Sequence, residues 1–495
     1  MSPASANAGP GKPRVAVIGG GLAGLSAAIE AADRGAAVTL FERRPRLGGA
    51  TWSFERNGIW FDNGQHVYMR CCTAYRAFLQ RIGADSDVRL QKRLDVVVLS
   101  PGGRRAAIKR TIGPAPLHLA PALLAYRHLS LRQRLAAARA GLALRRLDPD
   151  DRDLDRMTFG EWLEARGQDA AAVEGFWNLI VLPTVNVNAA EVSLKLAARV
   201  FVTGMLTEAG AADIGWSRTP LTALHADAGR RALQAAGGEI RSRLSVTAVK
   251  PGAQGLEVHL SKSPGTPRSS EPPTAGGSTD DSGSTGDDGT SGADRSDAQA
   301  AAADAVVVAV PHDAAAGLLP PGTLAAQERL SELGSSPIVN VHLVYDRPVT
   351  DLDFFATVGS DAQFVFDRTE AAGLDDGRQC LAVSLSAAES YIGRTSADLV
   401  SHFSAEITRL LPAAADAEVT DSMVTRERSA TFMGRPGTDP LRAPCESRLP
   451  GVYVAGAWTD TGWPATMEGA VRSGTAAGRL AVEFASVAAG RSRGG

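Results

Sequence analysis

The sequence predicts an α/β fold of two domains, the first of them built on a doubly wound parallel sheet. Two short apolar runs near the start of the chain, Val15–Ile18 and Val38–Phe41, are typical of buried parallel strands. A glycine-rich turn and a helical stretch separate these runs, which makes a strand–helix–strand unit. The chain also has 495 residues, more than one hydrophobic core usually holds, so a second domain is expected.

The turn after the first run has the spacing G-x-G-x-x-G, with glycines at Gly19, Gly21 and Gly24. The first makes a tight turn, the second lets a pyrophosphate approach the backbone, and the third lets the helix pack closely on the strand. The start of the helix offers free N–H groups to phosphates. Glu42 ends the second strand, where its carboxylate can accept both hydroxyls of a ribose. These features predict a Rossmann-type domain that binds a dinucleotide.

The residues after Glu42 indicate which dinucleotide is bound. Arg46, Gly48 and Gly49 form an R-x-G-G sequence that resembles the FAD-binding extension of the flavin amine oxidase and carotenoid desaturase superfamily. In that superfamily the arginine and the bare glycine backbone hold the diphosphate while the loop passes over the flavin. The resemblance implies FAD as the cofactor, and a Rossmann-type FAD-binding domain joined to an α+β substrate domain.

The C-terminal part of the chain resembles the same superfamily. Residues 452–460 are typical of a strand that runs into a turn, and residues 467–474 of the start of a helix. In the superfamily the N-terminus of this helix points at the flavin pyrimidine, where negative charge develops on reduction. The resemblance assigns four residues to the cofactor site: Gly456, Asp460, Met467 and Glu468. Ala457 stands where the superfamily usually has an acid that binds a ribityl hydroxyl, so we expect FAD to be held more loosely than usual.

A low-complexity segment, residues 262–303, has no large apolar side chain. Such a composition buries too little surface to offset the entropy of ordering, so we expect a disordered loop insert; a regulatory acidic segment is the alternative. Before the insert, the strand Leu244–Val249 is similar to the superfamily's strand beside the adenine. By this resemblance the backbone of Val246 contacts the adenine.

The resemblance makes the FAD-binding domain discontinuous. We expect it to contain residues 13–95, 219–314 and 425–490, with the substrate domain formed by residues 96–218 and 315–424. Residues 1–12 are rich in Ala, Pro, Gly and Ser, and they are expected to form a flexible tail rather than a signal peptide.

The segment from Val96 to Leu147 contains no Asp or Glu but many basic residues. These are Arg104, Arg105, Lys109, Arg110, Arg127, Arg132, Arg134, Arg139, Arg145 and Arg146. From Leu117 to Leu147 they mix with Leu and Ala at helical spacing, which is typical of an amphipathic helix on an anionic membrane surface. We therefore expect residues 104–146 to contact such a surface; a solvated face of ordinary helices is the alternative.

The overall composition excludes several classes of protein. A net charge of −2 gives no general attraction to nucleic acid. The four cysteines, Cys71, Cys72, Cys380 and Cys445, and the histidines lack metal-ligand spacing, which predicts free thiols in a reducing cytosol and no metal site. No run of 18 apolar residues is present. We expect a cytoplasmic protein, either free or peripheral on the inner face of the membrane.

Other stretches are similar to the hydroxysqualene dehydroxylases, FAD proteins of bacterial hopanoid pathways. The most specific are the Asp-Asn-Gly-Gln-His sequence of residues 62–66 and the Trp-Thr-Asp-Thr-Gly sequence of residues 458–462; residues 337–348 and 426–432 add to them. The resemblance implies that the allylic hydroxyl of a C30 isoprenoid is removed reductively to give squalene. This reaction needs a hydride from N5 of reduced flavin and a proton for the departing hydroxide.

Two positions disfavour amine oxidation. Amine oxidases of the superfamily place a lysine that reaches the flavin N5 through a water, whereas the comparable position here is Asn340, and residues 337–346 contain no lysine. They also place an aromatic residue just before the Met-Glu-Gly-Ala segment, where this chain has Thr466. The residues of an amine cage are therefore missing.

His66 is the first candidate for the general acid, with Asp62 and Asp460 as alternatives. His66 can equally bond the flavin or the backbone without transferring a proton. Three functions stay open: hydroxysqualene dehydroxylation, a phytoene-type carotenoid desaturation in the oxidative direction, and a prenyl-chain carrier without redox chemistry. The intact Glu42 and Arg46 argue against the carrier. The sequence does not indicate the electron donor.

Overall fold

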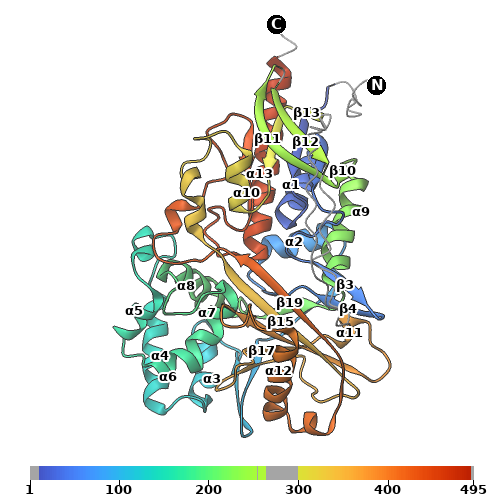
Figure 1. Ribbon diagram of the computed structural model, residues 1–495. Helices are drawn as coiled ribbons and strands as arrows, with labels where there is room; N and C mark the ends of the chain where they lie inside the picture. Colours follow the sequence, from blue (N-terminus) through green and yellow to red (C-terminus); the bar gives the residue numbers. More distant parts are fainter. Residues whose placement is uncertain (1–10, 254, 263–298, 492–495) are drawn as a thin grey trace, which may run out of the picture.

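The computed structural model describes residues 11–253, 255–262 and 299–491. Residues 1–10 of the predicted tail and residues 263–298 of the predicted insert lie outside the described residues. In Figure 1 a parallel sheet with its helices occupies the upper half of the molecule, a second sheet the lower half, and a group of short helices the left side.

The first sheet contains five parallel strands in the order β10–β2–β1–β14–β20. Its strands are β1 (Arg14–Ile18), β2 (Ala37–Glu42), β10 (Glu239–Ser242), β14 (Ala305–Val308) and β20 (Val452–Val454). Residues 15–18 and all of β14 are buried, because both faces of the sheet are covered. The predicted α/β class and the two predicted N-terminal strands are confirmed.

Different layers cover the two faces of this sheet. Helices α1 (Leu22–Asp33), α9 (Ala228–Ala235) and α13 (Met467–Arg491) pack on one face. The antiparallel strands β11 (Leu244–Gly252), β12 (Gly255–Lys262) and β13 (Gln299–Ala303) pack on the other. Residues 299–303, which the composition placed in the disordered insert, thus form a strand that pairs with β12. The prediction was wrong here because strands pair through backbone hydrogen bonds, and the residue composition of a segment does not show whether its backbone is paired.

Helix α13 crosses α1 with no large side chain between them. A Cβ on Gly474 would lie 2.1 Å from the carbonyl oxygen of Ala23, and a Cβ on Gly478 would lie 2.4 Å from that of Ala27. Small residues four apart on both helices therefore bring the two backbones into contact. This contact holds the start of α1 beside the N-terminal part of α13.

The second large sheet has seven strands in the order β19–β15–β18–β17–β16–β7–β8. They are β7 (Asp95–Ser100), β8 (Arg104–Lys109), β15 (Ser336–Tyr345), β16 (Phe354–Thr357), β17 (Phe364–Asp367), β18 (Gln379–Ser386) and β19 (Val419–Thr431). Helix α12 (Ser396–Leu410) packs on this sheet through Leu399, Phe403 and Ile407. The predicted domain boundary at residue 425 falls inside β19, which runs without a break.

Small elements join the two sheets. Strand β3 (Ser53–Arg56) pairs with β4 (Ile59–Asp62), and β9 (Ile214–Ser217) pairs with β5 (Val67–Met69) and β6 (Val88–Leu90). The remaining helices here are α2 (Thr73–Arg81), α10 (His312–Leu318) and α11 (Thr369–Ala372). The four residues that connect β4 to β5 are called the 63–66 loop below.

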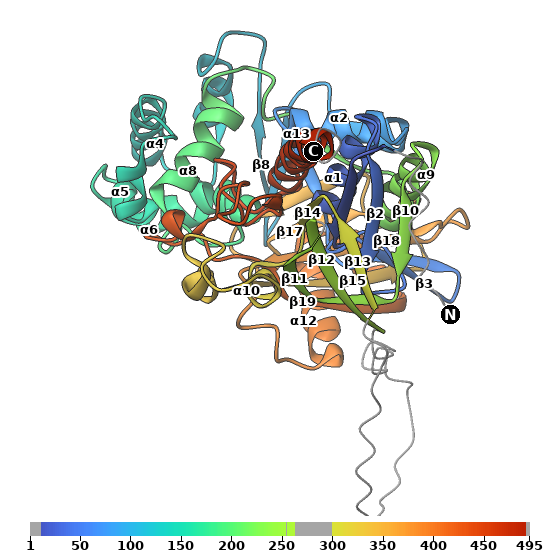
Figure 2. The same cartoon turned by 90° about the horizontal axis from the view of Figure 1, so that it is seen from above.

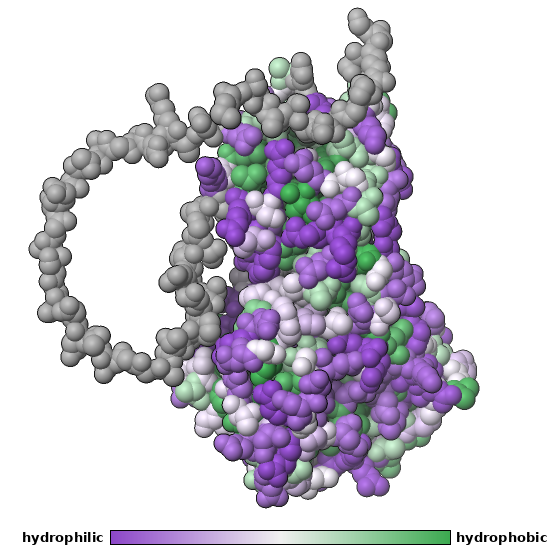
Figure 3. Space-filling view, turned by 90° about the vertical axis from the view of Figure 1, so that its right-hand side faces the viewer, coloured by the Kyte–Doolittle hydropathy of each residue, from purple (hydrophilic) through white to green (hydrophobic). Residues whose placement is uncertain are grey.

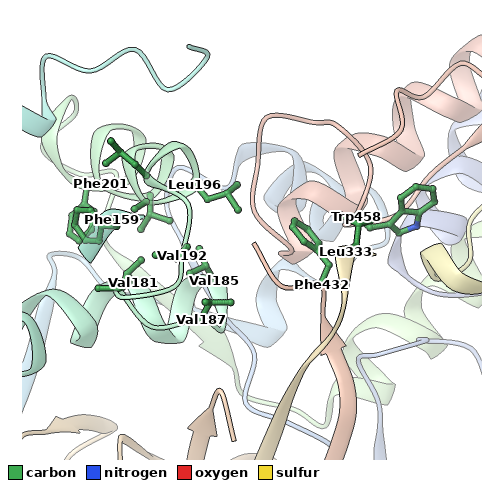
Figure 4. Packing of buried hydrophobic residues seen from close by; sticks show 14 of the residues in the cluster. Phe159, Val181, Val185, Val187, Val192, Leu196, Phe201, Leu333, Phe432 and Trp458 are labelled. Atoms are coloured by element: carbon green, nitrogen blue, oxygen red, sulfur yellow. The ribbon is translucent and has the colours of Figure 1, made fainter. Parts of the chain in front are cut away.

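Six helices gather on the left of Figure 1, and those labelled in Figure 2 lie on the same side. They are α3 (Ala120–Ala125), α4 (Leu131–Leu144), α5 (Phe159–Glu164), α6 (Ala170–Ala172), α7 (Asn178–Val185) and α8 (Leu194–Phe201). Figure 4 shows Phe159 and Phe201 together on the helical side, with Phe432 and Trp458 in a second set across from them. No helix of the described residues is long and apolar enough to cross a membrane.

Candidate functional site

The carboxyl ends of the parallel strands meet at one edge of the first sheet. The register aligns residues at the ends of β1, β2, β14 and β20: Ile18, Phe41, Val308 and Val454. Three predicted site residues therefore lie at or just beyond this edge: Gly19, Glu42 and Gly456. Strands β2 and β14 lie on opposite sides of β1. Doubly wound sheets bind their ligands in the crevice where the chain turns to opposite sides of one strand in this way.

The glycine turn after β1 leaves no room for a side chain at its first and last glycines. Gly19 has a φ of +102°, and a Cβ on Gly24 would lie only 1.8 Å from the carbonyl oxygen of Gly19. Glu42 is buried and accepts hydrogen bonds from the backbone N–H of Gly20 at 2.7 Å and of Arg44 at 2.8 Å. Each of its carboxylate oxygens keeps a lone pair for a further donor. The turn thus fixes Glu42 beside the start of α1.

A second glycine loop lies on this turn. The backbone N–H of Gly48 donates to the carbonyl oxygen of Gly20 at 2.9 Å. A Cβ on Gly49 would lie 2.8 Å from the Cα of Gly21, so the two backbones face each other without side chains. Backbone of this kind can approach a phosphate closely.

Arg46 lies beside the glycine loop as a half-buried cation. Its guanidinium stacks on the ring of Trp52, 3.9 Å from the centroid, and donates to the carbonyl oxygen of Gly49 at 3.3 Å. Burial, and secondly the charge of Arg44, lowers the pKa of Arg46 to about 10. The side chain therefore remains charged at neutral pH and is held in one orientation.

Asn63 joins the glycine loop to the second sheet. Its side-chain nitrogen donates to the carbonyl oxygen of Ala50 at 2.9 Å and to the carboxylate of Glu427 on β19 at 2.7 Å. Its side-chain oxygen accepts from the backbone N–H of Trp52 at 3.0 Å. The hydroxyl of Thr425 donates to the Asn63 carbonyl oxygen at 2.9 Å. The 63–66 loop therefore lies where the two sheets meet.

His66 and Asn340 both lie against Gly64 of this loop. A Cβ on Gly64 would lie 3.5 Å from Cε1 of His66 and 3.5 Å from Nδ2 of Asn340. Nδ1 of His66 lies 3.0 Å from the carbonyl oxygen of Gly64, and Asn340, on β15, is fully buried. Burial lowers the pKa of His66, so its imidazole is neutral at pH 7.

A second buried histidine, His225, lies near the loop, in a π-helical segment that leads into α9. Its Nε2 lies 2.8 Å from the hydroxyl of Tyr75 on α2. Burial lowers the pKa of His225 to about 3, and the nearby His66 contributes to this shift. The adjacent Ala226 packs on the glycine loop, since a Cβ on Gly48 would lie 3.6 Å from the Cβ of Ala226. His225 is thus placed between the loop of residues 46–49 and the 63–66 loop.

The family model described as flavin containing amine oxidoreductase matches residues 22–481, which is nearly the whole chain. The chain belongs to the flavin-containing amine oxidoreductase family. Its cofactor is FAD, as predicted.

Relatives in this family match along most of the chain. A hydroxysqualene dehydroxylase from Rhodopseudomonas palustris is 27% identical, with 94% of this chain and 97% of the relative covered. A zeta-carotene desaturase from Zea mays is 24% identical, with coverage of 94% and 82%, and a 15-cis-phytoene desaturase from Synechococcus elongatus is 25% identical, with coverage of 93% and 94%. The protein is therefore a flavin-dependent oxidoreductase of the amine oxidase and carotenoid desaturase group.

Solved structures share the fold. An oxidoreductase from Methanosarcina mazei superposes with a TM-score of 0.67 at 16% identity, covering 94% of this chain and 99% of that chain. A putrescine oxidase bound to putrescine gives a TM-score of 0.66 at 17% identity, covering 95% and 99%. These similarities confirm the predicted two-domain, flavin amine oxidase-like fold.

The residues at the crevice fit FAD. The half-buried Arg46 forms no ion pair with any described residue, so its charge is available to the diphosphate, with Gly21 and Gly49 supplying bare backbone. Glu42 would hold the ribose. Three buried polar atoms near the 63–66 loop have no partner among the residues that the structure describes: Nε2 of Gln65, Nδ1 of His225 and Oδ1 of Asn340. Because buried polar atoms are normally paired, these atoms are suited to the polar groups of a flavin.

Glu468 and Met467, both predicted to bind the cofactor, begin α13. The carboxylate of Glu468 is buried, accepts the backbone N–H of Ala74 at 3.2 Å and of Tyr75 at 2.8 Å, and pairs with Arg472 at 2.6 Å. It therefore caps the N-terminus of α2. Met467 packs against the core under α13. Glu468 thus joins the start of α13 to the start of α2, and its role at the cofactor stays a prediction.

Asp460 lies on the exposed side of the turn before α13. This turn is held from inside by Arg442, whose guanidinium donates to the carbonyl oxygens of Thr459 and Trp463, each at 2.6 Å. At its other end, the backbone N–H of Gly456 donates to Ser473 on α13 at 2.9 Å. Among the described residues Asp460 forms no hydrogen bond or ion pair with His66, so these two acid candidates do not form one cluster.

Asp62 is buried in a polar network. Its carboxylate pairs with Arg368 at 2.8 Å, accepts the hydroxyl of Ser53 at 2.6 Å and accepts the backbone N–H of Leu221 at 3.1 Å. These bonds anchor the end of β4, so Asp62 positions the loop that carries His66. Among the three acid candidates, His66 is the one within the 63–66 loop itself.

Val246 lies on β11, which contacts β2, at a bulge in the pairing with β12. The register moves from Val246 opposite Leu260 to Ala248 opposite His259, which leaves Thr247 unpaired. The adenine contact that the resemblance implies for Val246 stays a prediction.

Sequence reasoning gave no role to Trp52, Glu427 or His225. Trp52 follows Gly49 by three residues, and Glu427 lies in the stretch 426–432 that carries the subfamily resemblance, so both had a local signal. His225 had none, because its partner Tyr75 is 150 residues away in the sequence.

Proposed function

We propose that this protein is an FAD-dependent oxidoreductase that removes the allylic hydroxyl of hydroxysqualene to give squalene. The observation that carries the proposal is that His66 and Asn340 both lie against Gly64, in the loop that Asn63 ties to the glycine loop. In its protonated form an imidazole there can give a proton to a leaving hydroxyl, and an asparagine replaces the lysine of amine oxidation. The 27% identity to a hydroxysqualene dehydroxylase over nearly the full length supports the same assignment.

In this reaction an allylic C–O bond breaks, a C–H bond forms, and the departing hydroxide takes a proton to become water. Bound FAD in its reduced form supplies the hydride, and an external two-electron donor must return the electrons. His66 delivers the proton in the proposed scheme. The contact of its Nδ1 with the carbonyl oxygen of Gly64 fixes its ring.

The site must also enclose an apolar chain. A cavity of about 180 Å³ lies among α3, α4 and α8, and its lining includes Tyr126, Trp177 and Phe201. Its walls are almost wholly apolar, which supports a hydrocarbon substrate and disfavours a polar amine. The cavity has room for part of a C30 chain.

A phytoene-type desaturation is the second candidate, favoured by desaturases of similar identity among the relatives. It would use the same fold in the oxidative direction, with two hydrogens removed from the substrate and passed to the flavin. A prenyl-chain carrier with the same fold is the third candidate; it would change neither substrate nor flavin.

Single-turnover reactions without oxygen separate the three. The proposal expects that FAD-loaded protein, reduced by light, is reoxidised by hydroxysqualene and yields squalene by mass spectrometry. Reduction of oxidised protein by phytoene, with a product two hydrogens lighter, would instead establish desaturation. No change with either substrate would favour the carrier.

The role of His66 is tested separately. His66→Gln should keep FAD bound and slow the single turnover about 10²–10⁴-fold, because it removes a general acid. His402→Gln, which changes a partly exposed histidine on α12, is the matched control and should leave the rate unchanged. Full turnover in His66→Gln would exclude the acid role.

A further inference from the structure

Helix α4 exposes leucines on one face. Leu131, Leu135 and Leu142 are 63%, 45% and 50% exposed, and their separations of four and seven residues place them above one another. The opposite face is buried, at Ala137, Ala140 and Leu144. An exposed apolar stripe opposite a buried one has no role in packing the helix onto its own domain.

The apolar surface continues over the preceding segment. Ile112, Leu117 and Leu124 are between 56% and 81% exposed, and α3 packs on α4. Six of the eight strongly exposed large hydrophobic side chains in the described ranges thus fall within residues 112–142; they are called the leucine face below. The face of the molecule in Figure 3 differs, since its hydrophobic residues are scattered among hydrophilic ones. A concentration of this kind marks an interaction surface.

Exposed arginines accompany the leucine face. They are Arg127, Arg132, Arg139, Arg145 and Arg146. Arg132 has Asp169 nearby, whereas the other four form no ion pair with any residue of the described ranges. On α4, Arg132 and Arg139 are seven residues apart and follow the leucines along one side. The surface is therefore both apolar and positively charged.

The leucine face also borders the apolar cavity. Leu117 and Leu142 line the cavity on the side of this face, and Trp177, Phe201 and Met205 line it from the helices and turns behind. A hydrocarbon chain that leaves an apolar environment at this face would enter the apolar cavity without crossing water.

We propose that the leucine face docks on an anionic lipid bilayer, with the leucines in the interfacial region and the arginines on the headgroups. Leucines alone would fit any apolar partner, but the unpaired arginines favour a negatively charged surface. A second copy of the chain is disfavoured as the occupant, because a two-fold contact would set arginines against arginines. The proposal does not depend on which isoprenoid the enzyme uses.

Co-sedimentation with lipid vesicles tests the proposal on the full, FAD-loaded chain. We expect binding to vesicles that contain phosphatidylglycerol, much weaker binding to pure phosphatidylcholine vesicles, and loss of binding as salt is raised. Absence of binding to phosphatidylglycerol vesicles at low salt would overturn the proposal.

Variants then assign the surface. Replacement of Leu131, Leu135 and Leu142 by serine should weaken vesicle binding by about tenfold or more per leucine, and Arg139→Gln by about fivefold. Val487→Ser, on α13 and 58% exposed in the wild type, is the matched control and should bind as wild type does. Retained flavin absorbance shows that each variant is folded. If the triple variant binds like wild type, or if it changes only the oligomeric state measured by light scattering, the leucine face is not a membrane surface.

Discussion

Gly21 and Gly49 face each other so closely that a methyl group on Gly49 would lie 2.8 Å from the Cα of Gly21. The two residues belong to different loops, one after β1 and one after β2. Their contact leaves bare backbone from both loops at the N-terminus of α1, where a diphosphate binds in doubly wound folds.

Gly21→Ala should impair FAD binding with little effect on the apoprotein. Gly21 has a φ of −78°, which alanine tolerates, and the new Cβ would lie 3.6 Å from Gly49, an ordinary contact. The methyl group would, however, cover bare backbone that we expect to face the diphosphate, and one lost hydrogen bond to a charged group costs about 1.5–3 kcal/mol. We expect FAD affinity to fall about tenfold or more in a fluorescence titration. Unchanged affinity would place the diphosphate elsewhere.

Arg46→Gln should also weaken FAD binding by about tenfold or more, since it removes a charge-assisted bond. Arg43→Gln is the matched control, because Arg43 is an exposed arginine of the same loop. The two variants are compared in the same titration. Equal losses would mean that the loop contributes only general positive charge.

The pH dependence of turnover should report His66. Burial lowers its pKa below the ordinary value near 6.5, and a general acid is active in its protonated form. The rate of the chemical step should therefore rise as pH falls below neutrality and fall as pH rises. The pH profile of His66→Gln should lack this rise of the rate at low pH. A rate that rises with pH in the wild type would contradict the assignment.

His225 should make the folded protein sensitive to mild acid. Its pKa is about 3 in the folded state and about 6.5 when unfolded, so the unfolded state binds more protons between these values, and stability is lost as pH falls below 6.5. By this linkage, wild type should lose about 2 kcal/mol between pH 7 and pH 5 that His225→Leu does not lose. Urea unfolding at the two pH values measures the difference. Equal losses in both proteins would exclude a buried, neutral His225.

The crossing of α1 and α13 should be intolerant of any side chain. Gly474→Ala puts a methyl group 2.1 Å from the Ala23 carbonyl oxygen, and such overpacking costs about 1–3 kcal/mol. The melting temperature should fall accordingly. Gly317→Ala in α10, where a Cβ meets nothing within 4 Å, is the control and should be neutral or stabilising. Equal changes of the melting temperature in both variants would show that α13 can shift to accommodate the methyl group.

Local sequence predicted the strand–turn–helix and the type of cofactor, and both predictions are confirmed. The glycine turn, Glu42 and the R-x-G-G loop lie within about 30 residues of each other in the chain, and adjacent strands and turns determine their geometry. The predicted carboxylates were harder to assign. Asp62, an acid candidate, is held by Arg368, 306 residues away, and Glu468, a predicted cofactor residue, by the backbone of Tyr75, 393 residues away. Such partners leave no periodic signal in the sequence.

The sequence by itself determined the dinucleotide-binding strand–turn–helix, because spacing and residue type carry this chemistry. Its resemblance to the superfamily implied FAD and placed Asn340 where amine oxidases have a lysine. The tertiary structure decided which carboxylates are engaged elsewhere, that Asn63 joins the two sheets, and that His66, Asn340 and His225 gather around one loop. It also decided that the leucines of α4 face outward. These outcomes depend on which distant elements pack together, and burial and pairing across hundreds of residues are properties of the folded chain.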